Sequence, residues 1–166
     1  MNRREALKAA GLMAGGALFA SSGILEACRT GRTSSRVLSD EDQVLAEEIA
    51  DTLLPTTAGS PGAKAAGTGA AMNVILSDCY TPADQRAVTD GLARFRAKNF
   101  LGLSRADRET FVRSVGRQAW FAPVRDLALG AYFSSETGMT KALRYVRVPG
   151  KYVGCMPLEP GQPAWG

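Results

Sequence analysis

Three hydroxyl residues, each followed three positions later by an aspartate, mark expected helix starts in this chain. They are Ser39 with Asp42, Thr81 with Asp84, and Ser104 with Asp107. Such a hydroxyl accepts a hydrogen bond from a free backbone N–H of the first helical turn, and the positive end of the helix dipole favours the acid. The chain is therefore constrained to begin helices directly after these residues.

The apolar spacing extends these starts into an all-α fold. Val44, Leu45, Ile49, Leu53 and Leu54 recur at helical intervals and predict a helix over residues 40–54, ended by Pro55. Further helices are expected over 70–79, over 82–100, after Ser104, and from Pro123 to Tyr132. In the helix over 70–79, the side chains expected to be mostly buried are Met72, Val74, Ile75 and Leu76. We predict an irregular bundle of four to five helices with an extended, Gly/Pro-rich C-terminal tail.

Four segments follow from composition. Residues 1–28 form a signal segment, 29–38 a basic, Ser/Thr-rich linker, 39–137 the helical domain and 138–166 the tail. The tail is too rich in Gly and Pro for a core of its own. It also carries Tyr145, Tyr152, Cys155 and Trp165, and aromatic side chains are favoured anchors at interfaces. We expect the tail to lie across a partner or across its own domain.

The first residues are typical of an export signal. Arg3 and Arg4, with Leu7 and Lys8 at the right offsets, resemble the twin-arginine signal, and an uncharged stretch follows over residues 9–25. The twin-arginine translocase carries cargo that is already folded, often with a partner attached. The signal therefore predicts a periplasmic protein and, without a cofactor motif here, a partner that holds the cofactor.

The end of the signal leaves three alternatives open. Leu25-Glu26-Ala27-Cys28 resembles a lipoprotein site, in which Cys28 would be acylated. Cleavage nearby would remove Cys28, and retention of the segment would leave an anchor in the membrane. Membrane tethering is expected in the first and third cases.

Composition excludes several classes of function. The chain has no His, so Ser-His-Asp or Cys-His catalysis and His-ligated metal or haem sites are ruled out. A net charge of +4 without a basic block gives no support for nucleic-acid binding. We predict no catalytic, cofactor-binding or metal-binding residue in this chain. The carboxylates considered for acid/base catalysis are Glu47, Glu48, Asp51, Asp78, Asp84 and Asp90. Of these, Glu47, Glu48 and Asp51 are interpreted as a solvated helix surface opposite Leu45 and Ile49.

Two thiols remain in the mature chain. In an oxidising compartment, thiols commonly form disulfides. Cys79 and Cys155 would therefore form a disulfide with each other, or Cys155 would form one with a partner subunit. The third alternative leaves Cys79 as a buried apolar thiol beside Ile75 and Leu76. Trp120 and Phe121 are similarly read as burial at a helix junction rather than a stacking site for a ligand.

The chain resembles the gluconate 2-dehydrogenase subunit 3 family in four segments. They are the signal, LSDEDQVLAEEIADTLLP at 38–55, Pro-Gly-Ala at 61–63 and the closing PGKYVGCMPLEPGQPAWG at 149–166. The resemblance implies a small, non-catalytic subunit that exports and stabilises a large FAD-dependent sugar or polyol dehydrogenase. It also implies that a multihaem cytochrome c subunit can complete the complex. The alternative is an independent periplasmic lipoprotein or a module that binds a small ligand.

Overall fold

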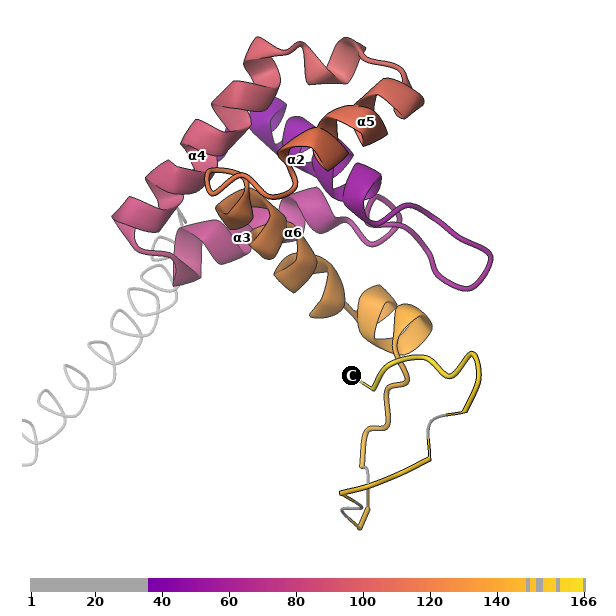
Figure 1. Cartoon of the computed structure of the whole chain (residues 1–166). Helices are drawn as coiled ribbons and strands as arrows, with labels where there is room; N and C mark the ends of the chain where they lie inside the picture. Colours follow the sequence, from indigo (N-terminus) through magenta and orange to yellow (C-terminus); the bar gives the residue numbers. More distant parts are fainter. Residues whose placement is uncertain (1–35, 149, 152–153, 158, 166) are drawn as a thin grey trace, which may run out of the picture. The chain divides into compact units, whose positions relative to one another are not determined.

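The computed structural model describes residues 36–148, 150–151, 154–157 and 159–165 (Figure 1). The helices in chain order are α2 (Asp40–Leu53), α3 (Thr68–Cys79), α4 (Pro82–Ala97), the 3₁₀ turn η1 (Phe100–Gly102), α5 (Arg105–Val115), α6 (Ala122–Phe133) and the π-helical turn η2 (Gly138–Ala142). In this part of the chain, β-type pairing is limited to isolated bridges. The predicted all-α bundle is confirmed.

All three predicted caps are present. The hydroxyl oxygens of Ser39, Thr81 and Ser104 accept hydrogen bonds from backbone N–H groups at 3.1, 3.3 and 3.2 Å. The same hydroxyls donate to the carboxylates of the aspartates three residues later. Each cap thus satisfies an N–H group that the helix itself leaves free, which explains why α2, α4 and α5 begin where they do.

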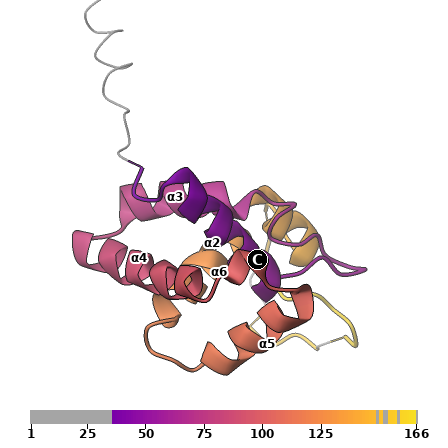
Figure 2. The same cartoon turned by 90° about the horizontal axis from the view of Figure 1, so that it is seen from above.

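Helix α2 lies at the centre and contacts α3, α4, α5, α6 and η1 (Figure 2). Its buried side chains are Leu45, Ala46, Ile49 and Ala50. Val44 was expected on this side, but it is 51% exposed. At about 100° per residue, Val44 lies opposite the face formed by those four residues, so helical spacing counted along the chain alone misplaced it.

Two glycines allow helices to approach closely. A Cβ on Gly69 of α3 would lie 2.7 Å from the Cβ of Glu47 on α2. A Cβ on Gly91 of α4 would lie 2.6 Å from a methyl group of Val124 on α6. The missing side chains therefore set the spacing of both helix pairs.

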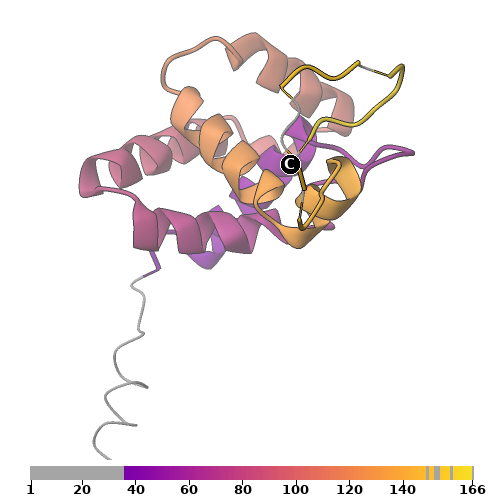
Figure 3. The same cartoon turned by 90° about the horizontal axis from the view of Figure 1, so that it is seen from below.

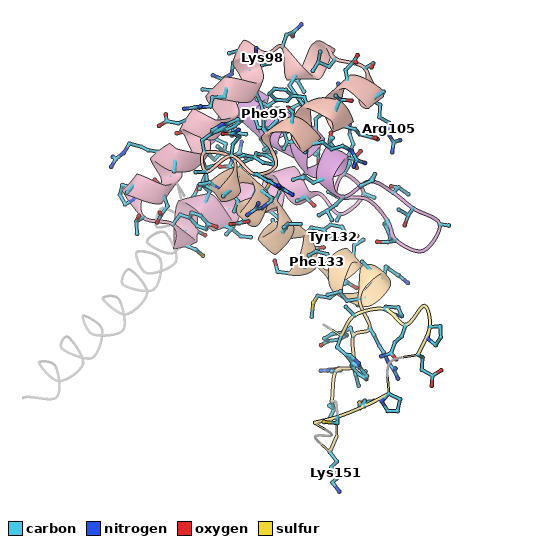
Figure 4. All side chains as sticks on the ribbon, in the orientation of Figure 1. Phe95, Lys98, Arg105, Tyr132, Phe133 and Lys151 are labelled. Carbon is cyan, nitrogen blue, oxygen red and sulfur yellow. The ribbon has the colours of Figure 1, made fainter. Side chains whose placement is uncertain are left out.

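An aromatic cluster fills the space between α4, η1, α5 and α6. Phe95, labelled in Figure 4, is fully buried and has ring centroids of Phe100, Phe111, Trp120 and Phe121 between 5.1 and 5.7 Å from its own. The interpretation of Trp120 and Phe121 as packed at a helix junction fits this cluster. The contacts of Phe95 with Phe100, Phe111 and Trp120 are edge-to-face, and such contacts add about 0.5–1.5 kcal/mol each beyond burial of area.

Two helix boundaries differ from the predicted ones by two residues or more. Helix α3 begins at Thr68 rather than 70. Met72 and Leu76 are buried as expected, whereas Val74 is 59% exposed, because the buried face of α3 also includes Thr68, Gly69 and Asn73. Helix α4 ends at Ala97 rather than near Phe100. Asn99 has φ 48°, and this left-handed conformation turns the chain into η1.

The segment boundaries also shift at both ends. Leu38, predicted to belong to the linker, is only 1% exposed and packs in the core. The predicted extended tail from residue 138 begins with η2, and an extended segment starts only at Leu143 (Figure 3). None of the helices in the described ranges is long and apolar enough to cross a membrane.

Candidate partner-binding surface

Exposed apolar side chains concentrate after η2. We call residues 143–165 the C-terminal loop. Large hydrophobic side chains exposed there are Tyr145, Val146, Val148, Met156 and Trp165. Val148, at 77%, is the most exposed of these, whereas the helices expose only Val44, Val74 and Leu101 in the part of the chain that the structure describes. A cluster of apolar side chains in water is typical of a surface that another molecule covers.

The two ends of the C-terminal loop are joined. The backbone N–H of Arg144 donates to the carbonyl oxygen of Ala164 at 2.7 Å, and Arg144 forms an isolated parallel bridge with Trp165. The Arg144 guanidinium carbon lies 4.3 Å from the centroid of the Trp165 ring, which is a cation–π contact. The loop is thus closed by backbone and side-chain contacts at its base.

Four residues were predicted as the partner interface. Tyr145 is 47% exposed, Trp165 is 46% exposed and Cys155 is also exposed. Tyr152 lies outside the described residues. The structure places Trp165 beside Arg144, which directly precedes Tyr145 in the chain. Whether these residues contact a partner stays a prediction.

Sequence reasoning missed the charged and aliphatic part of this loop. Arg144, Val146 and Val148 were not singled out, although they alternate with Tyr145 and Arg147 in a single run. For Arg144, the signal that would have found it is the local excess of positive charge. Residues 138–166 contain a single acidic residue, Glu159, and four basic ones: Lys141, Arg144, Arg147 and Lys151.

The thiols of Cys79 and Cys155 are both exposed and unpaired. The structure does not join them in an internal disulfide, and it does not bury Cys79 as an apolar thiol, because helix α3 turns this residue outward at its last position. The alternative in which Cys155 bonds to a partner subunit stays a prediction.

Among the carboxylates considered for catalysis, Glu48 has the most partners. Its Oε2 lies 2.6 Å from Nη1 of Arg108, and its Oε1 pairs with Lys64. The hydrogen bond from Lys64 and the two positive charges hold the pKa of Glu48 below its usual range against the opposing effect of burial. Arg108 also donates to the carbonyl oxygens of Phe100 and Leu101. Glu48 therefore ties α2 to α5 and to the loop before α3, and Arg108 extends this network to η1.

The other carboxylates have structural contacts or lie at the surface. Asp51 accepts from the backbone of Lys64 at 3.2 Å, and Asp84 belongs to the cap of α4. Asp78 and Asp90 are exposed, and Glu47 is half-buried. Among the described residues, no group of three or more His, Cys, Asp or Glu side chains is placed to hold a metal ion. The signal residues Arg3, Arg4, Leu7 and Lys8, together with Cys28, lie outside the described residues.

A second surface feature is an apolar groove between α2 and η1. It has a volume of about 270 Å³ and is lined by Glu41, Val44, Leu45, Arg96, Asn99, Phe100 and Leu101. Leu45 and Phe100 are buried, whereas Val44 and Leu101 are exposed beside them. Arg96 at the edge of the groove pairs with Asp42.

Comparison with protein families identifies the chain. The family model described as gluconate 2-dehydrogenase subunit 3 matches residues 40–150. The chain belongs to this family. Comparisons with curated proteins and with solved structures found no match. The resemblance inferred from the sequence is thereby confirmed at the level of the family.

The match to the gluconate 2-dehydrogenase subunit 3 family starts at the first residue of α2. It includes every helix of the described structure and the first part of the C-terminal loop, through Gly150. The helical core and the basic run before residue 150 are therefore both within the region shared with the family.

Proposed function

We propose that this chain is the non-catalytic small subunit of a periplasmic, membrane-associated FAD-dependent sugar or polyol dehydrogenase. In this proposal it binds the large subunit, which holds FAD and carries out the oxidation. The observation that carries the proposal is the family match, because the description of that family is a numbered subunit of a dehydrogenase.

The role proposed for the chain is that of an export escort and stabiliser. The arginine pair at residues 3–4 would direct the folded complex to the twin-arginine translocase. The large subunit would then cross the membrane attached to this chain. A multihaem cytochrome c subunit is the proposed route for electrons that leave the flavin.

The C-terminal loop supports the binding part of the proposal. Its exposed apolar side chains would lose contact with water against the large subunit, and burial of apolar area is worth about 25 cal/mol per Å² before the costs of association. Aromatic anchors such as Trp165 and Tyr145 would contribute most to such a contact. An exposed Cys155 would be accessible for a bond to the large subunit.

The test is co-purification of the full chain, tagged and expressed in its native host, from periplasm and membrane. The escort role predicts that the wild-type preparation contains a large subunit and a flavin absorbance. It also predicts that both are absent from the periplasm when Arg3 and Arg4 are changed to Lys. A matched control changes the exposed Arg113 and Arg117 of the helical domain to Lys, which should leave export intact.

The alternative function is an independent lipoprotein or small-ligand module. The observation in its favour is the apolar groove between α2 and η1, whose volume of about 270 Å³ is near the lower end for small-molecule sites. A colourless protein that purifies alone would contradict the escort role and favour this alternative.

A further inference from the structure

Charge is divided unevenly between the helices and the end of the chain. Residues 36–137 contain 11 Lys and Arg against 13 Asp and Glu, so this part is weakly acidic. Residues 138–166 contain four Lys and Arg against one Glu. The C-terminal segment therefore has a net charge opposite in sign to that of the domain from which it extends.

The cations of this segment have no acidic partner within the described structure. The ion pairs there join residues between Arg36 and Asp126, and none includes Lys141, Arg144, Arg147 or Lys151. Arg144 contacts the face of Trp165 instead. Arg147 and Lys151 are exposed, and Lys151 is labelled at the far end of the loop in Figure 4.

Apolar side chains alternate with these cations. Tyr145, Val146 and Val148 are 47%, 39% and 77% exposed, and they flank Arg147 in the chain. An apolar strip alone would favour any apolar surface, and a basic strip alone would favour any anion. Their combination fits a surface with an apolar centre and carboxylates around it, because interfaces exclude water from an apolar core inside a polar rim.

We infer that the C-terminal loop docks on an acidic, apolar-centred surface of the large dehydrogenase subunit. This inference rests on the proposed function and specifies the chemistry of the partner's surface. The contact between Arg144 and Trp165 closes the loop before binding, so less conformational freedom is lost when the partner binds. Arg147 and Lys151 supply the free charges, and Tyr145 and Val148 supply the apolar area.

A protein partner fits better than an anionic membrane surface. A lipid surface presents negative charge over a wide plane rather than around an apolar centre. A protein can place its carboxylates only where the loop contacts it. The segment from Leu143 to Val148 also has no helical turn, whereas peripheral segments commonly insert the apolar face of an amphipathic helix.

The test uses the co-expressed complex, captured through a tag on this chain and washed with reductant present so that no disulfide holds the subunits together. The large subunit retained is measured between about 50 and about 500 mM NaCl. We expect wild-type retention to fall with salt. The double variant Arg147→Glu/Lys151→Glu should retain roughly tenfold less large subunit at about 150 mM NaCl. The control Arg113→Glu/Arg117→Glu, on and after α5, should stay within about twofold of wild type.

Three results would overturn the inference. Equal retention by the loop variant and wild type at every salt concentration would show that loop charge does not bind the partner, while the proposed function would survive. A wild-type chain that captures no large subunit would remove the proposed function as well. In the third experiment, each chain without the large subunit is mixed with vesicles that contain about 30% phosphatidylglycerol. If the wild type floats with the vesicles and the loop variant does not, the loop binds the membrane instead.

Discussion

The buried side chain of Asn73 is hydrogen bonded to both backbone polar groups of Leu38. Its Oδ1 accepts from the Leu38 N–H at 3.1 Å, and its Nδ2 donates to the Leu38 carbonyl oxygen at 3.3 Å. Leu38 itself is 1% exposed. Helix α3 thereby holds the chain directly before α2 against the core.

Asn73→Ala should destabilise the domain by about 2–4 kcal/mol, because the N–H and carbonyl groups of Leu38 lose their partner in a buried place. Urea unfolding followed by circular dichroism measures this change. Asp78→Ala, at an exposed position of the same helix, is the control and should change stability by less than about 0.5 kcal/mol. Equal effects of the two substitutions would contradict the importance of the Leu38 contact.

Glu48 should make stability depend on pH in the acid range. Its pKa in the folded state is lowered from 4.5, chiefly by the hydrogen bond from Lys64, so its contribution is present above the unfolded pKa and is lost as the pH falls through the folded one. We expect wild type to lose about 1 kcal/mol more than Glu48→Gln between about pH 6 and about pH 3.

Urea unfolding of both proteins at a series of pH values checks this dependence. Glu109→Gln is the control, because the Glu109 carboxylate is paired only with Arg105 on an exposed face of α5. Parallel stability curves for wild type and Glu48→Gln would show that the pair with Lys64 and Arg108 adds nothing to stability in this range.

Two glycines near the end of α6 should respond to alanine with opposite signs. A methyl group at Gly138 would overlap the carbonyl oxygen of Tyr132, a backbone atom that cannot move freely. Gly138→Ala should therefore cost about 1–3 kcal/mol. At Gly130, inside α6, a methyl group would meet nothing within 4 Å, and Gly130→Ala should add about 0.5–1 kcal/mol.

Thermal unfolding of the two alanine variants checks this pair of predictions, since both substitutions add the same methyl group. A stabilising Gly138→Ala would show that the turn between Tyr132 and η2 can rearrange. A destabilising Gly130→Ala would mean that the exposed face of α6 near Gly130 is covered in solution.

Cys155 should form the bond to the large subunit if the thiols of the complex are oxidised. On a non-reducing gel of the purified complex, we expect a band at the summed mass of the two subunits. The band should vanish with reductant and in Cys155→Ser, and persist in Cys79→Ser, since both thiols are exposed but only Cys155 lies in the C-terminal loop. Identical reduced and non-reduced lanes would exclude the intersubunit bond.

Helix starts were predictable because their signals are local. Ser39, Thr81 and Ser104 cap helices through atoms only three residues away, so neighbouring positions in the chain suffice to recognise them. The end of α4 was not predictable in the same way. Asn99 adopts the left-handed conformation that Asn tolerates better than the neighbouring Arg and Lys, but an Asn can also continue a helix, so its residue type alone did not place the end.

The candidate surface was predicted only in part. The aromatic residues and Cys155 of the tail were recognised from their residue types, because Tyr and Trp are poor formers of disordered segments. That Arg147 and Lys151 have no acidic partner in the described structure could be learned only from the tertiary structure. An ion pair can form with any carboxylate that the fold brings near, and the sequence does not say which ones it brings.

The sequence by itself determined the helical class, the three capped helix starts, the family and the residue types of the C-terminal loop. All of these depend on residues close together in the chain. Only the tertiary structure decided that Val44 and Val74 face outward while Ala46, Ala50 and Asn73 are buried. The reason is physical: which face of a helix is covered depends on where its neighbours pack, and Gly69 and Gly91 set that packing through contacts between residues distant in the chain.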